Sequence, residues 1–169
     1  ELSIVTSKSQ TTRDSIKGII TTDNYQIVLS DTPGHVEASY MLHSKMNKNI
    51  FSSLEGCDLI IYVTDIYEKI VNNRLIEAVK KMSIPIYFLV NKNDQLKEKE
   101  YLPSVEHSTF SDYDIISADD KDDCKMILKK ILSYLPIHSP YYLNDDLTNK
   151  SERFIVSEII RKEVFELYK

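Results

Sequence analysis

The stretch IPIYFLVNKND, residues 84–94, decides the fold of this 169-residue chain. Its first seven residues are almost all β-branched, aromatic or leucine, a composition typical of a strand that is covered on both faces. The proline stands near the start of this run, where a missing N–H costs least. Four polar residues then end the apolar run. We therefore expect a central parallel strand with a polar loop at its carboxyl end.

Strands and amphipathic helices alternate along the rest of the chain. The predicted strands are Ser15–Thr22, Tyr25–Ser30, Cys57–Thr64, Ile84–Val90 and Tyr113–Ser117, and the predicted helices are Asn72–Met82, Lys121–Tyr134 and one that begins near Ser151. Asp23 and Asn24 join the first two strands in a tight hairpin, which would place an antiparallel strand at the edge of the sheet. The alternation predicts an α/β fold with a mostly parallel sheet and helices on both faces.

The composition excludes several classes of protein. An apolar fraction of 42% and a charged fraction of 28% are typical of a folded soluble domain. The net charge of -5, without a run of Lys or Arg, does not indicate a nucleic-acid-binding surface. Cys57 and Cys124 lie far apart and indicate free thiols in a reducing compartment. No apolar run is long enough to span a bilayer and no secretory signal is visible, so we expect a cytoplasmic chain.

Polar motifs follow three of the predicted strands. They are Asp31-Thr32-Pro33-Gly34, Asn91-Lys92-Asn93-Asp94 and Ser117-Ala118. In an open α/β sheet, ligands bind beyond the carboxyl ends of the strands. Each motif alone is a weak signal, and N-K-x-D is the most specific of them. The ordered set, with each member at the end of a strand, is a strong signal for a nucleotide site.

The donors and acceptors of the second motif point to guanine. Guanine offers two adjacent donors, N1–H and the exocyclic amine, and the Asp94 carboxylate can accept both. Adenine lacks that pair of donors, so a site built on Asp94 would reject it by roughly 10⁴-fold. Asn91 can bond the acceptor side of the base and tie neighbouring loops together, the stem of Lys92 can lie along the base plane, and the Ala118 N–H can reach the guanine oxygen. A loop that is merely capped by Asn and Asp side chains is the alternative.

The first motif predicts a sensor for magnesium and the γ-phosphate. The Asp31 carboxylate can hold Mg²⁺ through water, because Mg²⁺ gives up its hydration shell reluctantly. Gly34 lets its backbone N–H approach a γ-phosphate closely. That contact exists with GTP and is lost with GDP, so the segment that follows would act as a switch. A simple turn from Asp31 to Gly34 is the alternative.

With these motifs in place, the chain resembles the bacterial Era GTPases over nearly its whole length. Leu2–Thr6 and Gln10-Thr11-Thr12-Arg13 resemble the switch I region of Era, and the three motifs at the strand ends are similar to its nucleotide motifs. The tail Arg153–Arg161 resembles the segment that leads into the RNA-binding KH domain of the family. This tail is more diagnostic than the nucleotide motifs, which occur across GTPases.

The resemblance implies a P-loop-NTPase-type G domain that binds GTP or GDP with Mg²⁺ and hydrolyses GTP. It places in the nucleotide site Asp31, Thr32, Pro33, Gly34, Asn91, Lys92, Asp94, Ser117 and Ala118. Thr11 or Thr12 would be the switch I threonine near Mg²⁺ and the γ-phosphate, and the residues leave that choice open. The whole protein would assist maturation of the small ribosomal subunit by binding the 3′ end of its 16S rRNA. It would be a cytoplasmic monomer that can associate peripherally with the inner face of the cell membrane.

The chain departs from the family at both ends. No G-x-x-x-x-G-K-[ST] phosphate loop occurs in it, and without that loop we expect poor GTP binding and hardly any hydrolysis. Of the KH domain, only the entering helix is visible. We therefore interpret the chain as truncated at both ends. Residues 1–136 would form a G domain without its first strand and phosphate loop, residues 137–150 a linker, and residues 151–169 the first KH helix.

His35 also departs from the family. Era GTPases usually carry an apolar residue after D-x-x-G, whereas translational GTPases carry histidine there. His35 could orient the attacking water, with a solvated switch residue as the alternative. The string DTPGH makes a translational-type GTPase the first alternative for the chain, and the tail Arg153–Arg161 argues against it. A nucleotide-independent ribosome assembly or scaffold protein that has lost catalysis is the second alternative.

Overall fold

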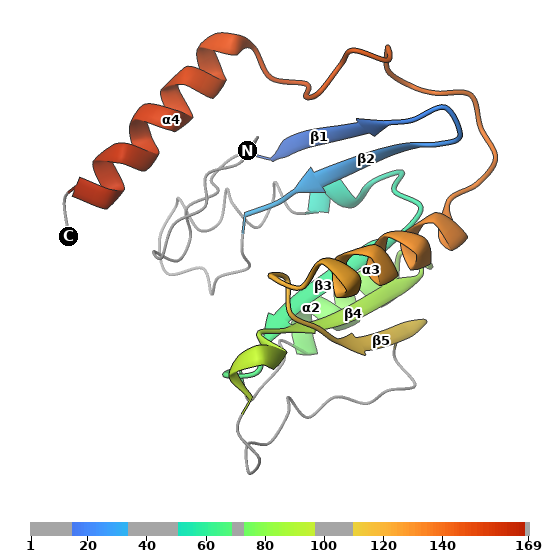
Figure 1. Cartoon of the computed structure of the whole chain (residues 1–169). Coiled ribbons are helices and arrows are strands. Elements are labelled where there is room, and N and C mark those ends of the chain that lie inside the picture. Colours follow the sequence, from blue (N-terminus) through green and yellow to red (C-terminus); the bar gives the residue numbers. More distant parts are fainter. Residues whose placement is uncertain (1–14, 34–50, 69–72, 97–109, 168–169) are drawn as a thin grey trace. The chain divides into compact units, whose positions relative to one another are not determined.

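The computed structural model describes residues 15–33, 51–68, 73–96 and 110–167 (Figure 1). The chain divides into two compact units. One combines Glu1–Glu55 with His138–Lys169, and the other is Gly56–Ile137. Each unit is described by itself. None of the helices in the described ranges is long and apolar enough to cross a membrane.

A three-stranded parallel sheet organises the unit Gly56–Ile137. Its strands, in spatial order, are β3 (Ile60–Asp65), β4 (Ile86–Asn91) and β5 (Asp112–Ile115). Its helices are α2 (Asn73–Lys80), the short 3-10 helix η1 (Asn93–Gln95) and α3 (Lys121–Tyr134). All residues of β4 before Asn91 are buried, so the central parallel strand predicted from the sequence is confirmed. Pro85 precedes this strand, and its carbonyl accepts the Ile60 N–H at 3.0 Å.

An aromatic row crosses the three strands on one face of this sheet. The strand register sets Tyr62, Phe88 and Tyr113 side by side. The ring centroid of Phe88 lies 5.4 Å from that of Tyr62 and 5.6 Å from that of Tyr113. Ile76 of α2 packs into the same cluster. Helix α2 therefore covers the Phe88 face of the sheet.

The opposite face of the sheet packs against α3. Lys130 of α3 forms ion pairs with Asp112 at 2.9 Å and with Asp114 at 2.7 Å. Its Nζ also lies 5.1 Å from the ring centroid of Tyr87, whose hydroxyl donates to Asp114 at 2.7 Å. Successive residues of a strand point to opposite faces, and Tyr87 is the neighbour of Phe88. The prediction of helices on both faces is therefore confirmed.

An antiparallel hairpin belongs to the other unit. Strands β1 (Ile16–Thr21) and β2 (Gln26–Asp31) pair along their full length. Thr22 closes the turn, because its Oγ1 accepts the N–H groups of Asn24 and Tyr25 at 3.3 and 3.2 Å. The predicted hairpin is confirmed. Among the described residues it is a two-stranded sheet of its own. The expectation that it lies at the edge of the parallel sheet stays a prediction.

The segment that connects α3 to α4 (Glu152–Leu167) lies along this hairpin. We call residues 138–150 the connecting segment. The Ile19 N–H donates to the Leu147 carbonyl at 2.9 Å, and Gly18 and Thr148 form an antiparallel bridge. The sequence predicted a linker here on its composition alone, without these contacts. The domain bounds 1–136, 137–150 and 151–169 stay a prediction.

Gln26 fastens the connecting segment to β2. Its Oε1 accepts the N–H of Tyr141 at 2.8 Å and that of Tyr142 at 3.0 Å. Its Nε2 donates to the Tyr142 carbonyl at 3.0 Å and to Thr21 Oγ1 at 2.9 Å. A glutamine amide has two N–H donors and two oxygen lone pairs. All four are occupied, which makes Gln26 the main side-chain contact between hairpin and segment.

We predict that Gln26→Leu loosens the connecting segment and lowers the free energy of unfolding by about 1–3 kcal/mol. Hydrogen exchange should quicken at the amides of Tyr141 and Tyr142, because both lose their acceptor. Gln26→Glu is the matched control: it keeps an acceptor for both amides but loses the donors, so exchange should fall between wild type and Gln26→Leu. Equal exchange in all three proteins would contradict the role of Gln26.

We also predict that Tyr87 contributes to the alkaline sensitivity of the fold. Burial raises the pKa of Tyr87 above its usual value, and the hydrogen bond to Asp114 and the charges of both aspartates raise it further. The unfolded chain loses this proton near pH 10, whereas the folded chain keeps it to higher pH. The stabilisation is therefore complete below about pH 10 and is lost as the pH rises further, at up to about 1.4 kcal/mol per pH unit.

Urea unfolding between pH 8 and 12 tests this prediction. The free energy of unfolding of Tyr87→Phe should fall less steeply above pH 10 than that of wild type. Tyr141→Phe removes a hydroxyl from a side chain that is 72% exposed, and it should follow the wild-type slope. A wild-type slope in Tyr87→Phe would contradict the assignment.

Candidate functional site

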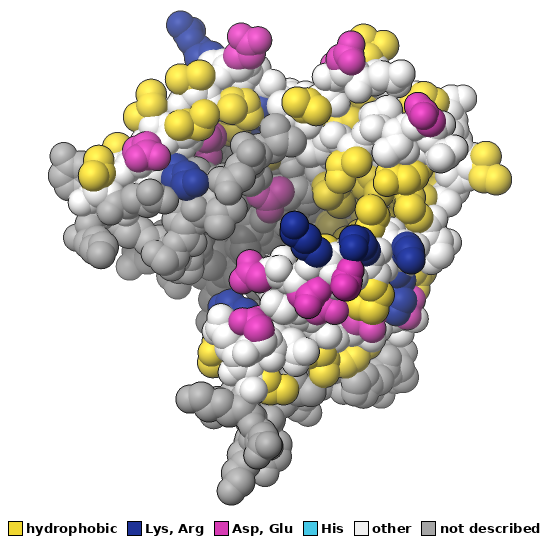
Figure 2. Space-filling view, in the orientation of Figure 1, with side chains coloured by type: hydrophobic (Ala, Val, Ile, Leu, Met, Phe, Trp, Pro, Cys, Tyr) yellow, Lys and Arg dark blue, Asp and Glu magenta, His cyan; other side chains and the backbone are white. Residues whose placement is uncertain are grey.

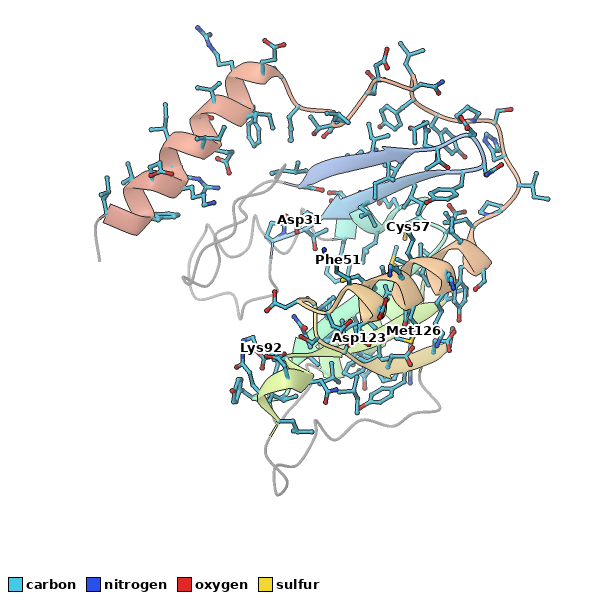
Figure 3. The ribbon with its side chains drawn as sticks, in the orientation of Figure 1. Asp31, Phe51, Cys57, Lys92, Asp123 and Met126 are labelled. Atoms are coloured by element: carbon cyan, nitrogen blue, oxygen red, sulfur yellow. The ribbon has the colours of Figure 1, made fainter. Side chains whose placement is uncertain are left out.

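The loops after β3, β4 and β5 meet at the carboxyl edge of the parallel sheet. The register pairs Asp65, the last residue of β3, with Asn91, the last residue of β4. The Ile116 N–H donates to the Val90 carbonyl at 2.8 Å, and the Asn93 N–H donates to the Ile116 carbonyl at 3.0 Å. These backbone bonds bring the second and third predicted motifs together. Figure 3 shows Lys92 beside η1 at this edge.

Asn91 joins two of these loops through one atom. Its Oδ1 accepts the N–H of Lys92 at 2.8 Å and that of Ala118 at 2.9 Å. Asn91 therefore links the loop after β4 to the loop after β5. The Ala118 N–H, for which the sequence predicted a contact with a guanine oxygen, is already bonded to Asn91 in the structure. A base oxygen at this point would have to share that N–H in a three-centre bond.

Asp94 is oriented by Ser117. The Ser117 hydroxyl donates to Asp94 Oδ1 at 2.7 Å, and the Ser117 N–H donates to Asp123 Oδ2 of α3 at 2.8 Å. Ser117 is 8% exposed, whereas Asp94 is exposed. A carboxylate has about four acceptor positions, and Ser117 occupies one of them. An exposed acceptor held in a fixed direction suits a ligand with adjacent N–H donors.

Lys92 has an unusual backbone and an ion partner that the sequence analysis missed. Its φ of 69° and ψ of 31° are left-handed, which is uncommon for a residue other than glycine. Its Nζ lies 2.6 Å from Asp65 Oδ2, and the side chains are 42% and 29% exposed. Burial opposes the ionisation of Asp65, but hydrogen bonds from Lys92 and the Tyr67 N–H outweigh it and lower the pKa of the carboxyl. The hydrogen bond to Asp65 raises the pKa of Lys92.

Asp65 could have been found from the sequence. It follows the predicted strand Cys57–Thr64 directly, as the recognised motifs follow theirs. Parallel strands bring all their carboxyl ends to one edge, so the residue after this strand is a candidate for the same site. Asp123 was not predicted either. It lies in the first turn of α3 (Figure 3), where no motif marks it.

The predicted residues of the first motif lie in the other unit. Asp31 is the exposed last residue of β2, Thr32 is half-buried and Pro33 is buried. Gly34, the predicted catalytic His35 and the predicted switch I residues Gln10, Thr11, Thr12 and Arg13 lie outside the described residues. Within the ranges that the structure covers, no three His, Cys, Asp or Glu side chains are placed to hold a metal ion. The magnesium ligands therefore stay a prediction.

Comparison with a family model places the chain among GTPases. The model described as 50S ribosome-binding GTPase matches residues 1–92, which is more than half of the chain.

Individual relatives point to one kind of GTPase. The chain is 33% identical to the GTPase Era of Lactobacillus delbrueckii subsp. bulgaricus, over 99% of this chain and 57% of that protein. It is 34% identical to the GTPase Era of Clostridium kluyveri, over 99% of this chain and 59% of that protein. The chain thus spans less than two thirds of the length of these relatives.

Two solved structures share its fold. One is Era in complex with MgGDPNP and nucleotides 1506–1542 of 16S ribosomal RNA, with a TM-score of 0.85 and 27% identity over 99% of this chain and 60% of that chain. The other is a variant of Aquifex aeolicus Era bound to GDP·AlF4⁻, with a TM-score of 0.86 and 29% identity over the same shares. The predicted α/β fold of the P-loop G-domain type is confirmed. The chain therefore belongs to the GTPase family that the matching model describes. Within that family it is similar to the Era GTPases.

Proposed function

We propose that the loops after β4 and β5 bind the guanine base of GTP and GDP. The observation that carries this proposal is the joined arrangement of Asn91, Asp94, Ser117 and Ala118. The exposed Asp94 carboxylate can accept both N1–H and the exocyclic amine of guanine, with Ser117 fixing its direction. Adenine has no such donor pair and would leave a charged acceptor unpaired.

The phosphate end of the nucleotide belongs to the same proposal. Asp31 would hold Mg²⁺ through water, Thr11 or Thr12 would contribute to the same ion, and the Gly34 N–H would contact the γ-phosphate. The binding of MgGDPNP and of GDP·AlF4⁻ by the two solved Era structures supports GTP, GDP and Mg²⁺ as the ligands. The protein would hydrolyse GTP to GDP. His35 would orient the attacking water.

We further propose that the whole protein assists maturation of the small ribosomal subunit through 16S rRNA. The support is the Era structure that contains a fragment of that RNA. Figure 2 shows Lys, Asp and Glu side chains mixed over α3, so the visible face of that helix is not a basic RNA surface. The RNA contacts are expected beyond α4, in a KH domain that α4 begins. The cytoplasmic location, the monomeric state and the peripheral membrane association rest on the family resemblance alone.

The exposure of α4 supports its assignment as the start of another domain. Its apolar side chains lie uncovered along the helix (Figure 2). They are Val156, Ile159, Ile160, Val164 and Leu167, which are 44–76% exposed. A helix that displays several large apolar side chains needs a partner to cover them. A KH domain packed on α4 would supply that cover.

We predict that Asp94→Asn in the full-length gene product exchanges guanine for xanthine. The variant amide offers one acceptor and one donor, which match N1–H and the C2 oxygen of xanthine but not the two donors of guanine. GDP affinity should fall by about 100-fold or more, and affinity for xanthosine diphosphate should rise. Equilibrium titration with both nucleotides measures this exchange.

Asp122→Asn is the matched control for that experiment. Asp122 is an exposed aspartate whose carboxylate pairs with Lys125 on α3, and its replacement should leave GDP affinity unchanged. Wild-type protein that binds ADP as tightly as GDP would contradict the assignment of Asp94. A protein that binds neither nucleotide would favour the scaffold alternative.

We predict that His35→Ala slows hydrolysis without weakening GTP binding. The imidazole would position water only during the chemical step, so the single-turnover rate should fall by about tenfold or more at saturating GTP. His138→Ala, on the connecting segment, is a control that should hydrolyse GTP at the wild-type rate. A wild-type single-turnover rate in His35→Ala would remove His35 from the mechanism.

A further inference from the structure

A tight turn after β3 braces the Asp65 carboxylate. The Glu68 N–H donates to the Asp65 carbonyl at 3.1 Å and the Tyr67 N–H to Asp65 Oδ1 at 2.9 Å. The second carboxylate oxygen, Oδ2, accepts from Lys92 Nζ at 2.6 Å. One oxygen therefore fixes the carboxylate to its own turn, and the other reaches across to the loop after β4.

Tyr67 and Gln95 close these contacts into a ring. The Nζ of Lys92 lies 5.5 Å from the ring centroid of Tyr67, and the Tyr67 hydroxyl donates to Gln95 Oε1 at 3.0 Å. The Gln95 N–H donates back to the Lys92 carbonyl at 2.9 Å. Both ends of Lys92, its backbone and its ammonium group, are therefore held by the same set of residues. We call Asp65, Tyr67, Lys92 and Gln95 the lysine clasp.

The lysine clasp limits where the Lys92 stem can lie. A free lysine side chain samples many rotamers, and ordering it on binding a ligand costs entropy. Asp65 and Tyr67 hold the ammonium group, while the left-handed backbone of Lys92 sets the direction in which its side chain leaves the loop. The methylene stem between these fixed ends is thus ordered before any ligand arrives. A preorganised apolar wall loses less entropy when a flat ring packs against it.

We propose that Asp65 is a positioning residue for nucleotide retention, because it holds Lys92 so that its stem forms one wall of the guanine pocket. This inference rests on the proposed function, since it concerns the same base site. Asp65 would affect how long the nucleotide stays bound, whereas Asp94 would determine which base is bound. Tyr67 supports the same role through its ring and its bond to Gln95.

Nucleotide release from the full-length gene product tests the proposal. Asp65→Asn keeps the shape of the side chain and removes its charge, so release of fluorescently labelled GDP should become about three- to tenfold faster. Lys92→Met keeps the stem and removes the ammonium group, and it should release GDP faster as well. Asp65 acts only through Lys92, so the double variant should release GDP no faster than Lys92→Met alone. The preference for GDP over ADP should be unchanged in Asp65→Asn.

A matched ion pair at the opposite edge of the sheet provides the control. Asp112 at the start of β5 pairs with Lys130 at 2.9 Å and is 32% exposed, close to the 29% of Asp65. Asp112→Asn should lower the urea midpoint at least as much as Asp65→Asn does, yet release GDP at the wild-type rate. Tyr67→Phe is a second test that leaves the carboxylate intact, and it should speed release by less than Asp65→Asn.

The outcomes separate this inference from the proposed function. If the wild-type protein fails to prefer GDP over ADP, both are overturned. If it prefers GDP but Asp65→Asn releases GDP at the wild-type rate, only the role of Asp65 is overturned. Additive effects in the double variant, or equally fast release from Asp112→Asn, would also overturn the positioning role. Asp65 would then contribute only to the stability of the fold.

Discussion

One side-chain oxygen, Asn91 Oδ1, holds the candidate site together. It accepts the N–H of Lys92 and that of Ala118, and so ties the loop after the central strand to the loop after its neighbour. The left-handed turn at Lys92 and the bond from Ser117 to Asp94 both lie within the loops that this oxygen joins. A substituted residue 91 without an acceptor would leave two backbone donors without their partner. The proposed base site depends on this one bridge.

The central strand explains why the bridge is well supported. Its residues Ile86–Val90 are buried between α2 and α3, with an aromatic row on one face and the Lys130 ion pairs on the other. Tight packing on both sides leaves the strand little freedom to shift. Its last residue, Asn91, is therefore presented at a fixed height on the sheet edge. The rigid strand thus serves as the scaffold, and the polar loop at its end carries the candidate site.

Local patterns carried the fold prediction far. The spacing of apolar residues predicted the bounds of α3, and two β-rich runs around Asp23-Asn24 predicted the hairpin. The position of each base motif after a buried strand predicted which loops meet at the sheet edge. The pairing of Asp65 with Lys92 was missed because it joins residues that are far apart in the sequence, and it becomes visible only once the register of β3 and β4 is known. No periodicity marks such a contact.

The connecting segment shows a second limit of sequence reasoning. Its proline and polar residues are typical of a linker, yet it pairs with the hairpin through backbone groups and the Gln26 amide. Backbone hydrogen bonds leave almost no trace in residue type, and the partners Gln26 and Tyr141 are 115 positions apart. The structure describes the first motif only in part, because its last residue, Gly34, lies outside the described residues, as does the neighbouring His35.

The joined loops after β4 and β5 form the proposed guanine site. The most direct measurement is a ¹⁵N NMR titration of the full-length gene product with GDP and, separately, with ADP. GDP should shift the amide signals of Lys92, Ser117 and Ala118, while ADP at the same concentration should leave them in place. Equal shifts with both nucleotides, or unmoved signals at saturating GDP, would rule out a guanine site in these loops.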